Sequence, residues 1–350
     1  MDAFTFLSVL QDGIVGGATY TLLAIGVVLI FNVTRIGFVP YGDLVSLSVL
    51  TYADLQQGRF PRTIYLVVGL MLVAIVLEII SLVRSGRFAD MPRAALIYLV
   101  LPLVAVVLAA LAGRYSAMIL NVLLTLALML PIGPLLYRVI FQPARSTSVL
   151  SLLMIAVALH FALAGATLLL FGSEGYRMES YFDLSIATPY IEIGGQAILV
   201  LVGCALCSLV LYAYFEFTLQ GKALRATALN RVGAEIVGIR TRDSGSIAFL
   251  IATGLAVITG FLIAPNLTFY HDTGFLIGLK GFVGSVLGGF VSYPLAALGG
   301  FLIGNIESFS AYFWSPYKEF IVFIAIIPVI ILRYVLSTDR PSTESEGEHA

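Results

Sequence analysis

Long apolar stretches alternate with short polar or charged breaks along almost the whole chain. Eleven apolar segments stand out, and most of them have about 20 residues, the length that an α-helix needs to cross a bilayer. The segments are residues 7–31, 38–52, 64–83, 94–112, 118–137, 149–171, 196–217, 245–264, 275–290, 294–311 and 318–336. The pattern predicts an all-α fold, a polytopic transmembrane helical bundle with about 9–11 membrane segments.

Two of these segments, 38–52 and 275–290, are too short for a simple crossing. Both contain glycine, and each has a proline within it or close by, Pro40 and Pro294. Short and interrupted membrane segments often line a transport pathway as broken or re-entrant elements. We therefore expect these two segments to lie near such a pathway.

Composition supports a membrane protein and argues against other classes. Sixty per cent of the residues are hydrophobic and 11% are charged, and the mean hydropathy is +1.02. A soluble domain of this length could not bury so much apolar surface. The formal net charge of −1 does not indicate a nucleic-acid partner.

The sequence gives no sign of a catalytic or metal site. Cys204 and Cys207 lie in an apolar run without further ligands, so they are interpreted as small packing residues. Gly221 and Lys222 do not belong to a nucleotide-binding P-loop, because the glycine that this motif requires five positions earlier is absent. We expect no catalytic residues, no bound metal and no cofactor in this chain, which by itself is not an enzyme.

The distribution of basic residues predicts the orientation in the membrane. With the N-terminus outside, 13 of the 19 Lys and Arg residues fall on the inner side. The other six are Arg59, Arg62, Arg114, Arg177, Lys280 and Lys318. This predicts a retained first span, a membrane domain over residues 1–336 and a cytoplasmic C-terminus. The polar tail, residues 337–350, is expected to be disordered.

Two long loops differ in character. Residues 172–195 are polar and acidic and fall outside, whereas residues 219–244 are basic and rich in alanine and fall inside. Alanine favours helix, and Gly233 and Gly238 are expected to break or cap short helical pieces. A short helix on the cytoplasmic face would suit the docking of a soluble partner. The alternative is a basic loop that only fixes the topology.

Four stretches in the same order resemble the permeases of branched-chain amino acid ABC transporters. They are GATYTLLAIGVVLIFNVTRIGF from Gly17, LYRVIFQPARS from Leu136, GKALRATALNRVGAEIVGI from Gly221 and LKGFVGSVLGGFVSYPLAALGG from Leu279. The third resembles the loop that couples such permeases to their ATPase. The residues that match the family pattern there are Gly221, Lys222, Ala223, Arg225, Ala226, Ala228, Asn230, Ala234, Gly238 and Ile239.

The resemblance implies a subunit of an ATP-driven importer in the bacterial inner membrane. Two ATP-binding subunits would bind the nucleotide, a periplasmic binding protein would deliver the solute, and a second, paralogous permease subunit would complete the pathway. The sequence departs from the family at GFVPYGD, at Gln142 and in an additional block over residues 81–116. The solute is therefore left open between branched-chain amino acids and a related small organic molecule.

Four polar residues in or near the apolar segments are candidates for the pathway: Asn32, Asp43, Lys280 and Glu307. Ionisable groups inside a membrane are costly and usually face a partner or a cavity. We predict that Lys280 pairs with Glu307, with substrate binding by Lys280 as the alternative. For Asp43 and Asn32, helix capping or interfacial solvation competes with a pathway role. Glu78 is expected to snorkel to the inner interface.

Small residues recur at the spacing that brings membrane helices close together. The candidates for helix packing are Gly284, Gly288, Gly289, Gly300 and Gly304. An autonomous secondary transporter or channel would explain the hydrophobicity and the short segments equally well. That alternative leaves the alanine-rich cytoplasmic loop without a role.

Overall fold

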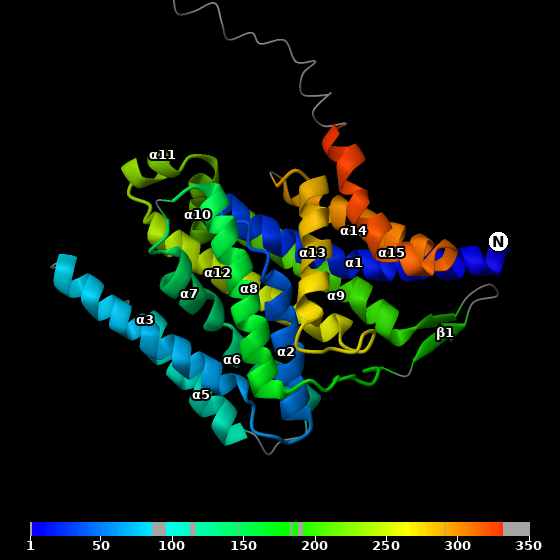
Figure 1. The fold of residues 1–350 in the computed structure, drawn as a ribbon, viewed down its shortest axis with the longest axis horizontal. Helices are drawn as coiled ribbons and strands as arrows, with labels where there is room; N and C mark the ends of the chain where they lie inside the picture. Colours follow the sequence, from blue (N-terminus) through cyan, green and yellow to red (C-terminus); the bar gives the residue numbers. More distant parts are fainter. Residues whose placement is uncertain are drawn as a thin grey trace, which may run out of the picture.

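The protein is a helical bundle in the computed structural model, which describes residues 2–85, 96–112, 117–145, 147–182, 184–187, 192–290 and 292–331 (Figure 1). Its main helices are α1 (Ala3–Thr34), α2 (Tyr41–Gln56), α3 (Thr63–Ser85), α5 (Leu101–Ala112), α6 (Met118–Met129), α7 (Ile132–Leu136), α8 (Val149–Phe171), α9 (Gly195–Phe217), α10 (Leu219–Leu229), α11 (Arg231–Ile236), α12 (Thr241–Ile263), α13 (Thr273–Leu287), α14 (Tyr293–Phe313) and α15 (Lys318–Ile324). Short π and 3-10 turns adjoin them: η2 (Leu96–Val100), η3 (Tyr137–Phe141) and η4 (Ser315–Tyr317).

Six helical stretches of the described chain are long and apolar enough to cross a membrane. They are α1, α3, the continuous run from α6 to η3, α8, α9 and α12, and α5 and α13 are shorter apolar helices. This confirms the predicted polytopic helical bundle. The bounds expected from the sequence are close to the observed ones, and those of α8 agree at both ends.

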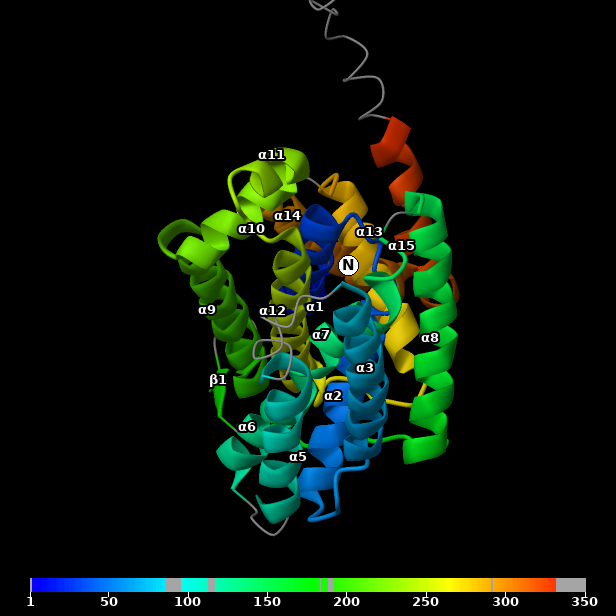
Figure 2. The same ribbon diagram turned by 90° about the vertical axis from the view of Figure 1, so that its left-hand side faces the viewer.

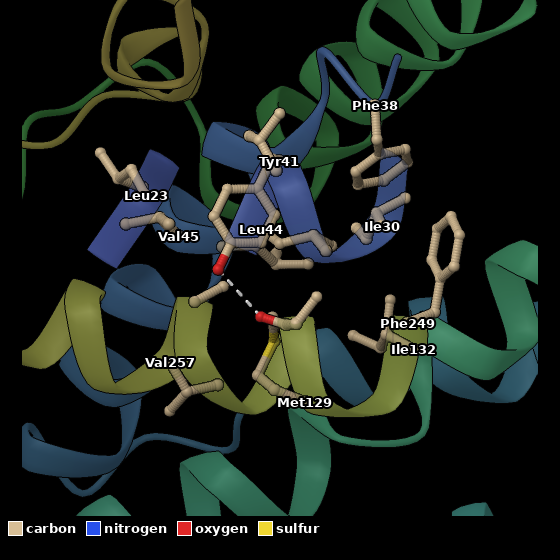
Figure 3. Packing of buried hydrophobic residues seen from close by; sticks show 14 of the residues in the cluster. Leu23, Ile30, Phe38, Tyr41, Leu44, Val45, Met129, Ile132, Phe249 and Val257 are labelled. Atoms are coloured by element: carbon tan, nitrogen blue, oxygen red, sulfur yellow. Dashed lines mark hydrogen bonds between the residues drawn. The ribbon is translucent and has the colours of Figure 1, made fainter. Parts of the chain in front are cut away.

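The short helix α2 lies at the centre of the bundle. Every residue from Tyr41 to Leu55 is buried, which is typical of a helix that is surrounded by protein on all sides. The Tyr41 hydroxyl donates a hydrogen bond to the Ala252 carbonyl of α12 at 3.0 Å, and Phe38 packs edge-on against Phe249 (Figure 3). Because neighbouring helices cover α2, it does not need the length of a lipid-facing span.

Glycines allow the central helices to approach closely. A side chain at Gly42 of α2 would collide with the backbone of Gly274 and Gly278 in α13. Gly284 and Gly300 face each other between α13 and α14, Gly288 faces Ala296, and Gly304 lies against Gly17 of α1. Gly289 differs, because it has a φ of +73° in the turn between α13 and α14, a conformation that favours glycine.

The two long loops lie at opposite ends of the bundle. Helices α10 and α11 cap one end, whereas the N-terminus and a small hairpin lie at the other (Figure 1). In the hairpin, β1 (Ser185–Ala187) pairs antiparallel with β2 (Glu192–Gly194), with Ser185 opposite Gly194. The sequence did not predict these strands. The expected disordered tail lies outside the described residues.

The block that departs from the family pattern forms part of the edge of the bundle. It comprises the end of α3, then η2 and α5, and Figure 2 shows α3 and α5 side by side at the periphery. Most of their exposed side chains, such as those of Ile79 and Val104, are apolar. This edge therefore has the surface expected of lipid-facing helices.

Candidate docking surface and intramembrane polar clusters

The loop over residues 219–244 forms short helical pieces as expected, α10 and α11, on one face of the membrane domain. The Thr218 hydroxyl caps α10 by accepting from the Gly221 amide at 2.9 Å, and Asn230 Oδ1 caps α11 by accepting from the Gly233 amide at 2.9 Å. The break therefore falls at Asn230, and the expectation that Gly233 interrupts the helix is wrong. Gly238, with a φ of +86°, follows the end of α11.

These two helices are fastened to the membrane helices beneath them. Gly221 lies so close to the Tyr214 carbonyl at the end of α9 that a side chain would not fit. Arg35, which follows α1, donates to the Ala228 carbonyl at 3.1 Å. The hydroxyls of Thr227 and Ser244 lie 3.3 Å apart and link α10 to α12. A force applied to α10 would therefore reach α1, α9 and α12.

The outer side of α10 and α11 presents large apolar side chains to solvent. Five of them are between 68% and 86% exposed: Leu219, Leu229, Val232, Ile236 and Val237. Leu224 and Ala234 point the other way and are buried. We call the five exposed side chains the docking surface. Apolar groups clustered in this way typically mark a site of protein interaction.

Two basic residues of the predicted coupling loop, Lys222 and Arg225, lie on α10. Lys222 and Arg225 are both exposed. Arg225 does not project as a free charge, because its guanidinium pairs with Glu216 at the end of α9, at 3.0 Å. After the end of α11, the Ile239 amide donates to the Ala234 carbonyl at 2.9 Å.

The predicted pairing of Lys280 with Glu307 is present, within a larger cluster. Lys280 Nζ lies 2.6 Å from Glu307 Oε1 and 3.0 Å from Glu319 Oε1. The Tyr20 hydroxyl donates to the other oxygen of Glu307 at 2.6 Å. We call these four residues the Lys280 cluster. It joins α1, α13, α14 and α15, and the sequence had not indicated Glu319 or Tyr20 as members.

Asp43 has a partner that the sequence did not reveal. It is buried in the first turn of α2, and its Oδ2 lies 2.8 Å from Nδ1 of His160 in α8. His160 stacks on Phe275 of α13 at a ring distance of 4.4 Å. Pro40 occupies the N-cap position of α2, so the capping interpretation of Asp43 is wrong. Asn32 is half-buried in the last turn of α1.

A buried ion pair also overturns the interpretation of Glu78. Glu78 of α3 does not snorkel to the interface, because its Oε2 lies 2.6 Å from the Arg138 guanidinium and both side chains are buried. Arg138 also donates to Gln142 Oε1 at 3.1 Å and to the Leu77 carbonyl at 3.3 Å. The pair joins α3 to η3.

At the hairpin end of the bundle, Arg62 fastens the C-terminal end of α2. Its guanidinium donates to both carboxylate oxygens of Asp54, at 2.6 Å and 3.0 Å, and to the Tyr176 hydroxyl at 2.9 Å. It also lies 4.7 Å from the centre of the Phe171 ring. The hydrogen bond to Asp54 raises the pKa of Arg62 above its ordinary value, so the guanidinium stays charged at any pH that the folded protein meets.

The long apolar helices identify a multi-pass membrane protein. Comparison with known proteins gives the family. The sequence model of the branched-chain amino acid transport system permease component matches residues 9–331. The chain belongs to this family, which contains transporter permease subunits.

Relatives of the chain carry the same description. It is 28% identical over 214 residues to the high-affinity branched-chain amino acid transport system permease protein LivH of Escherichia coli, covering 59% of this chain and 70% of the relative. It is 24% identical over 350 residues to BraD of Pseudomonas aeruginosa, covering 98% and 99%. PsaBC from Streptococcus pneumoniae aligns over 95% of each chain, but with 11% identity and a TM-score of only 0.37.

Proposed function

We propose that this chain is the membrane-spanning permease subunit of an ATP-driven, binding-protein-dependent importer. Its solutes would be branched-chain amino acids or related small organic molecules. The observation that carries the proposal is the match of the family over residues 9–331, almost the whole described chain. The names of the relatives, LivH and BraD, support the choice of solute. The N-terminus would face outward and the C-terminus the cytoplasm.

In this proposal two ATP-binding subunits, one for each permease, dock at the cytoplasmic end. The docking surface supports it, since five exposed apolar side chains on two capped helices suit the cleft of a soluble partner. The predicted coupling residues Lys222 and Arg225 lie on the same helix. ATP would be bound by these subunits, so the chain would need no cofactor of its own.

The remaining partners follow from the same scheme. A second, paralogous permease subunit would complete the pathway, and a periplasmic binding protein would deliver the solute at the hairpin end. The contacts from α10 to α1 and α12 would carry the closure of the ATP-binding subunits into the membrane helices. The Lys280 cluster and the pair of Asp43 with His160 both join different helices. A relative movement of those helices would therefore change the contacts in both.

The docking surface can be tested by the double substitution Val232→Asp and Ile236→Asp. Both side chains are exposed, so the fold should tolerate the change, whereas burying two carboxylates in an apolar interface would be costly. We expect normal membrane levels, loss of co-purifying ATP-binding subunits and at least a ten-fold fall in uptake of L-leucine. The matched control is Leu184→Asp, an equally exposed apolar residue at the hairpin end.

Two results would contradict this proposal. Normal co-purification of the ATP-binding subunits with the double variant would remove the docking role from α11. Transport by the isolated chain in liposomes, without ATP or any partner, would instead identify an autonomous secondary transporter or channel.

A further inference from the structure

A cavity of about 470 Å³ lies at the end of the bundle opposite the docking surface. Its walls come from the first half of α1, the start of α9, the segment after α12 and the loop after α8. In Figure 1 the N-terminus, the start of α9 and the hairpin lie together on this side. Its volume is in the range of sites that hold small molecules.

The cavity contains one anionic and one cationic side chain, Asp12 of α1 and Arg177 of the loop after α8. Within the described part of the chain, neither side chain has a hydrogen bond or an ion-pair partner. Both side chains are exposed, whereas the carboxylates of Asp43, Asp54, Glu78 and Glu307 lie within the bundle and are all paired. Asp12 and Arg177 are therefore both available to bind a ligand at the cavity.

The two charged side chains come from different parts of the fold. Asp12 projects from a membrane helix, and Arg177 belongs to a loop. The remaining wall has both apolar and polar side chains: Val15, Ile263 and Leu267 are apolar, whereas Gln11, Thr19 and Asn266 are polar. The cavity therefore offers an acceptor for a cation, a donor for an anion and an apolar surface.

We propose that this cavity is a binding subsite for a zwitterionic α-amino acid with an apolar side chain. Arg177 would bind the carboxylate, since a guanidinium matches the geometry of two carboxylate oxygens. Asp12 would accept hydrogen bonds from the ammonium group. Val15, Ile263 and Leu267 would contact the aliphatic side chain. The inference rests on the proposed function and adds the place where the solute enters the permease.

The walls are held in place by contacts outside the cavity. Tyr176 and Phe269 exchange two backbone hydrogen bonds of 2.8 Å, which hold the loop of Arg177 against the segment that carries Asn266 and Leu267. Arg62 donates to the Tyr176 hydroxyl at 2.9 Å. A site whose walls are already positioned loses less entropy when it binds its ligand.

The test uses the complete importer in proteoliposomes, with ATP and binding protein supplied and L-leucine as the probe. We expect Arg177→Gln and Asp12→Asn each to lower the maximal uptake rate by about ten-fold or more, as for the loss of a hydrogen bond to a charged group. Stimulation of ATP hydrolysis by the binding protein should be unchanged. Arg59→Gln and Glu179→Gln are the matched controls, because these exposed residues are on the same side but outside the cavity.

A second variant keeps the test decisive if a single substitution also disturbs ATP hydrolysis. Exchanging the charges, Asp12→Arg with Arg177→Asp, preserves one cation and one anion in the cavity. A zwitterion can bind in the reversed direction, so uptake should recover above that of either single change. Absence of any recovery would then overturn the subsite.

The outcomes separate this inference from the proposed function. If the wild-type complex imports L-leucine and both neutral variants do so at the same rate, the subsite is overturned and the proposed function stands. If a variant needs more binding protein for half-maximal uptake but reaches the normal maximal rate, the residues contact the binding protein instead. If the wild-type complex imports neither L-leucine nor any related small organic solute, the proposed function falls and the subsite with it.

Discussion

Lys280 is a buried cation between two carboxylates. Glu307 and Glu319 lie within 3.0 Å of its ammonium group, and Tyr20 donates to Glu307. Transfer of an ion out of water is expensive, so the cluster is not an efficient source of stability. Removing one partner is worse, because it leaves an uncompensated charge in the bundle. Each member therefore depends on the others.

We expect Lys280→Met to destabilise the purified complex by about 3 kcal/mol, as measured by the midpoint of thermal unfolding in detergent. Exchanging the charges, Lys280→Glu with Glu307→Lys, should restore part of this loss because the opposite charges remain adjacent. Lys318→Met is the matched control, since Lys318 is half-buried and, within the described residues, has no ion-pair partner.

The same experiment separates a structural role from a pathway role for Lys280. If Lys280 binds solute, Lys280→Met would assemble with normal stability yet fail to take up L-leucine. A Lys280→Met protein that is both stable and competent in transport would contradict both roles.

Only some partners of the buried charged residues could be predicted from the sequence. The pairing of Lys280 with Glu307 was predictable, because both lie in neighbouring apolar segments and an isolated charge there would be costly. His160 and Arg138 were missed as partners of Asp43 and Glu78. Their segments are far apart in sequence, and only the packing of α8 and η3 brings them together. A search for complementary charges among all apolar segments would have raised both pairs as candidates.

Close helix crossings set the geometry of the central helices. Gly42 is the clearest case, since the backbone of Gly274 and Gly278 occupies the space that its side chain would need. Because α2 lies at the centre of the bundle, α2 and α13 cannot separate without opening the bundle. The distance between α2 and α13 is therefore fixed by this contact.

Gly42→Ala should destabilise the complex by about 1–3 kcal/mol, because an added methyl group forces packed backbones apart. The matched control is Gly69→Ala in α3, where no atom lies within 4 Å of the new side chain. That change should be neutral or slightly stabilising, since alanine favours a helix over glycine by about 1 kcal/mol. Thermal unfolding of the two variants measures the difference, and equal midpoints would contradict the fixed crossing.

Helix bounds were predictable, but their positions in the bundle were not. The breaks between apolar runs located α8 and α9 because a bilayer imposes a minimum length on each span. The central place of α2 could not be read from its length, which only indicated an unusual segment. The hairpin was missed because strands of three residues leave no periodic pattern. The start of α11 followed from the cap at Asn230, whereas the expectation had relied on Gly233.

At the scale of the whole molecule, one helix connects the three regions discussed above. Helix α1 has 32 residues, so it is about 48 Å long at 1.5 Å per residue. Its first part lines the cavity through Asp12, its middle part carries Tyr20 of the Lys280 cluster, and Arg35 at its end holds α10. A rigid helix with contacts of this kind is a physical route between the docking surface and the cavity.

Opposite ends of the bundle must face opposite sides of the membrane if the chain works as proposed. The distribution of basic residues predicts that α11 faces the cytoplasm and that the loop after α8 lies outside, and the structure separates these regions (Figure 1). Val237 and Glu174 are exposed positions in the two regions. Single cysteines there, with Cys204 and Cys207 changed to serine, report the orientation directly. An impermeant thiol reagent should label Glu174→Cys in intact spheroplasts and Val237→Cys only after the membrane is opened. Labelling with the reverse preference would invert the topology, and the docking surface would then face away from any ATP-binding partner.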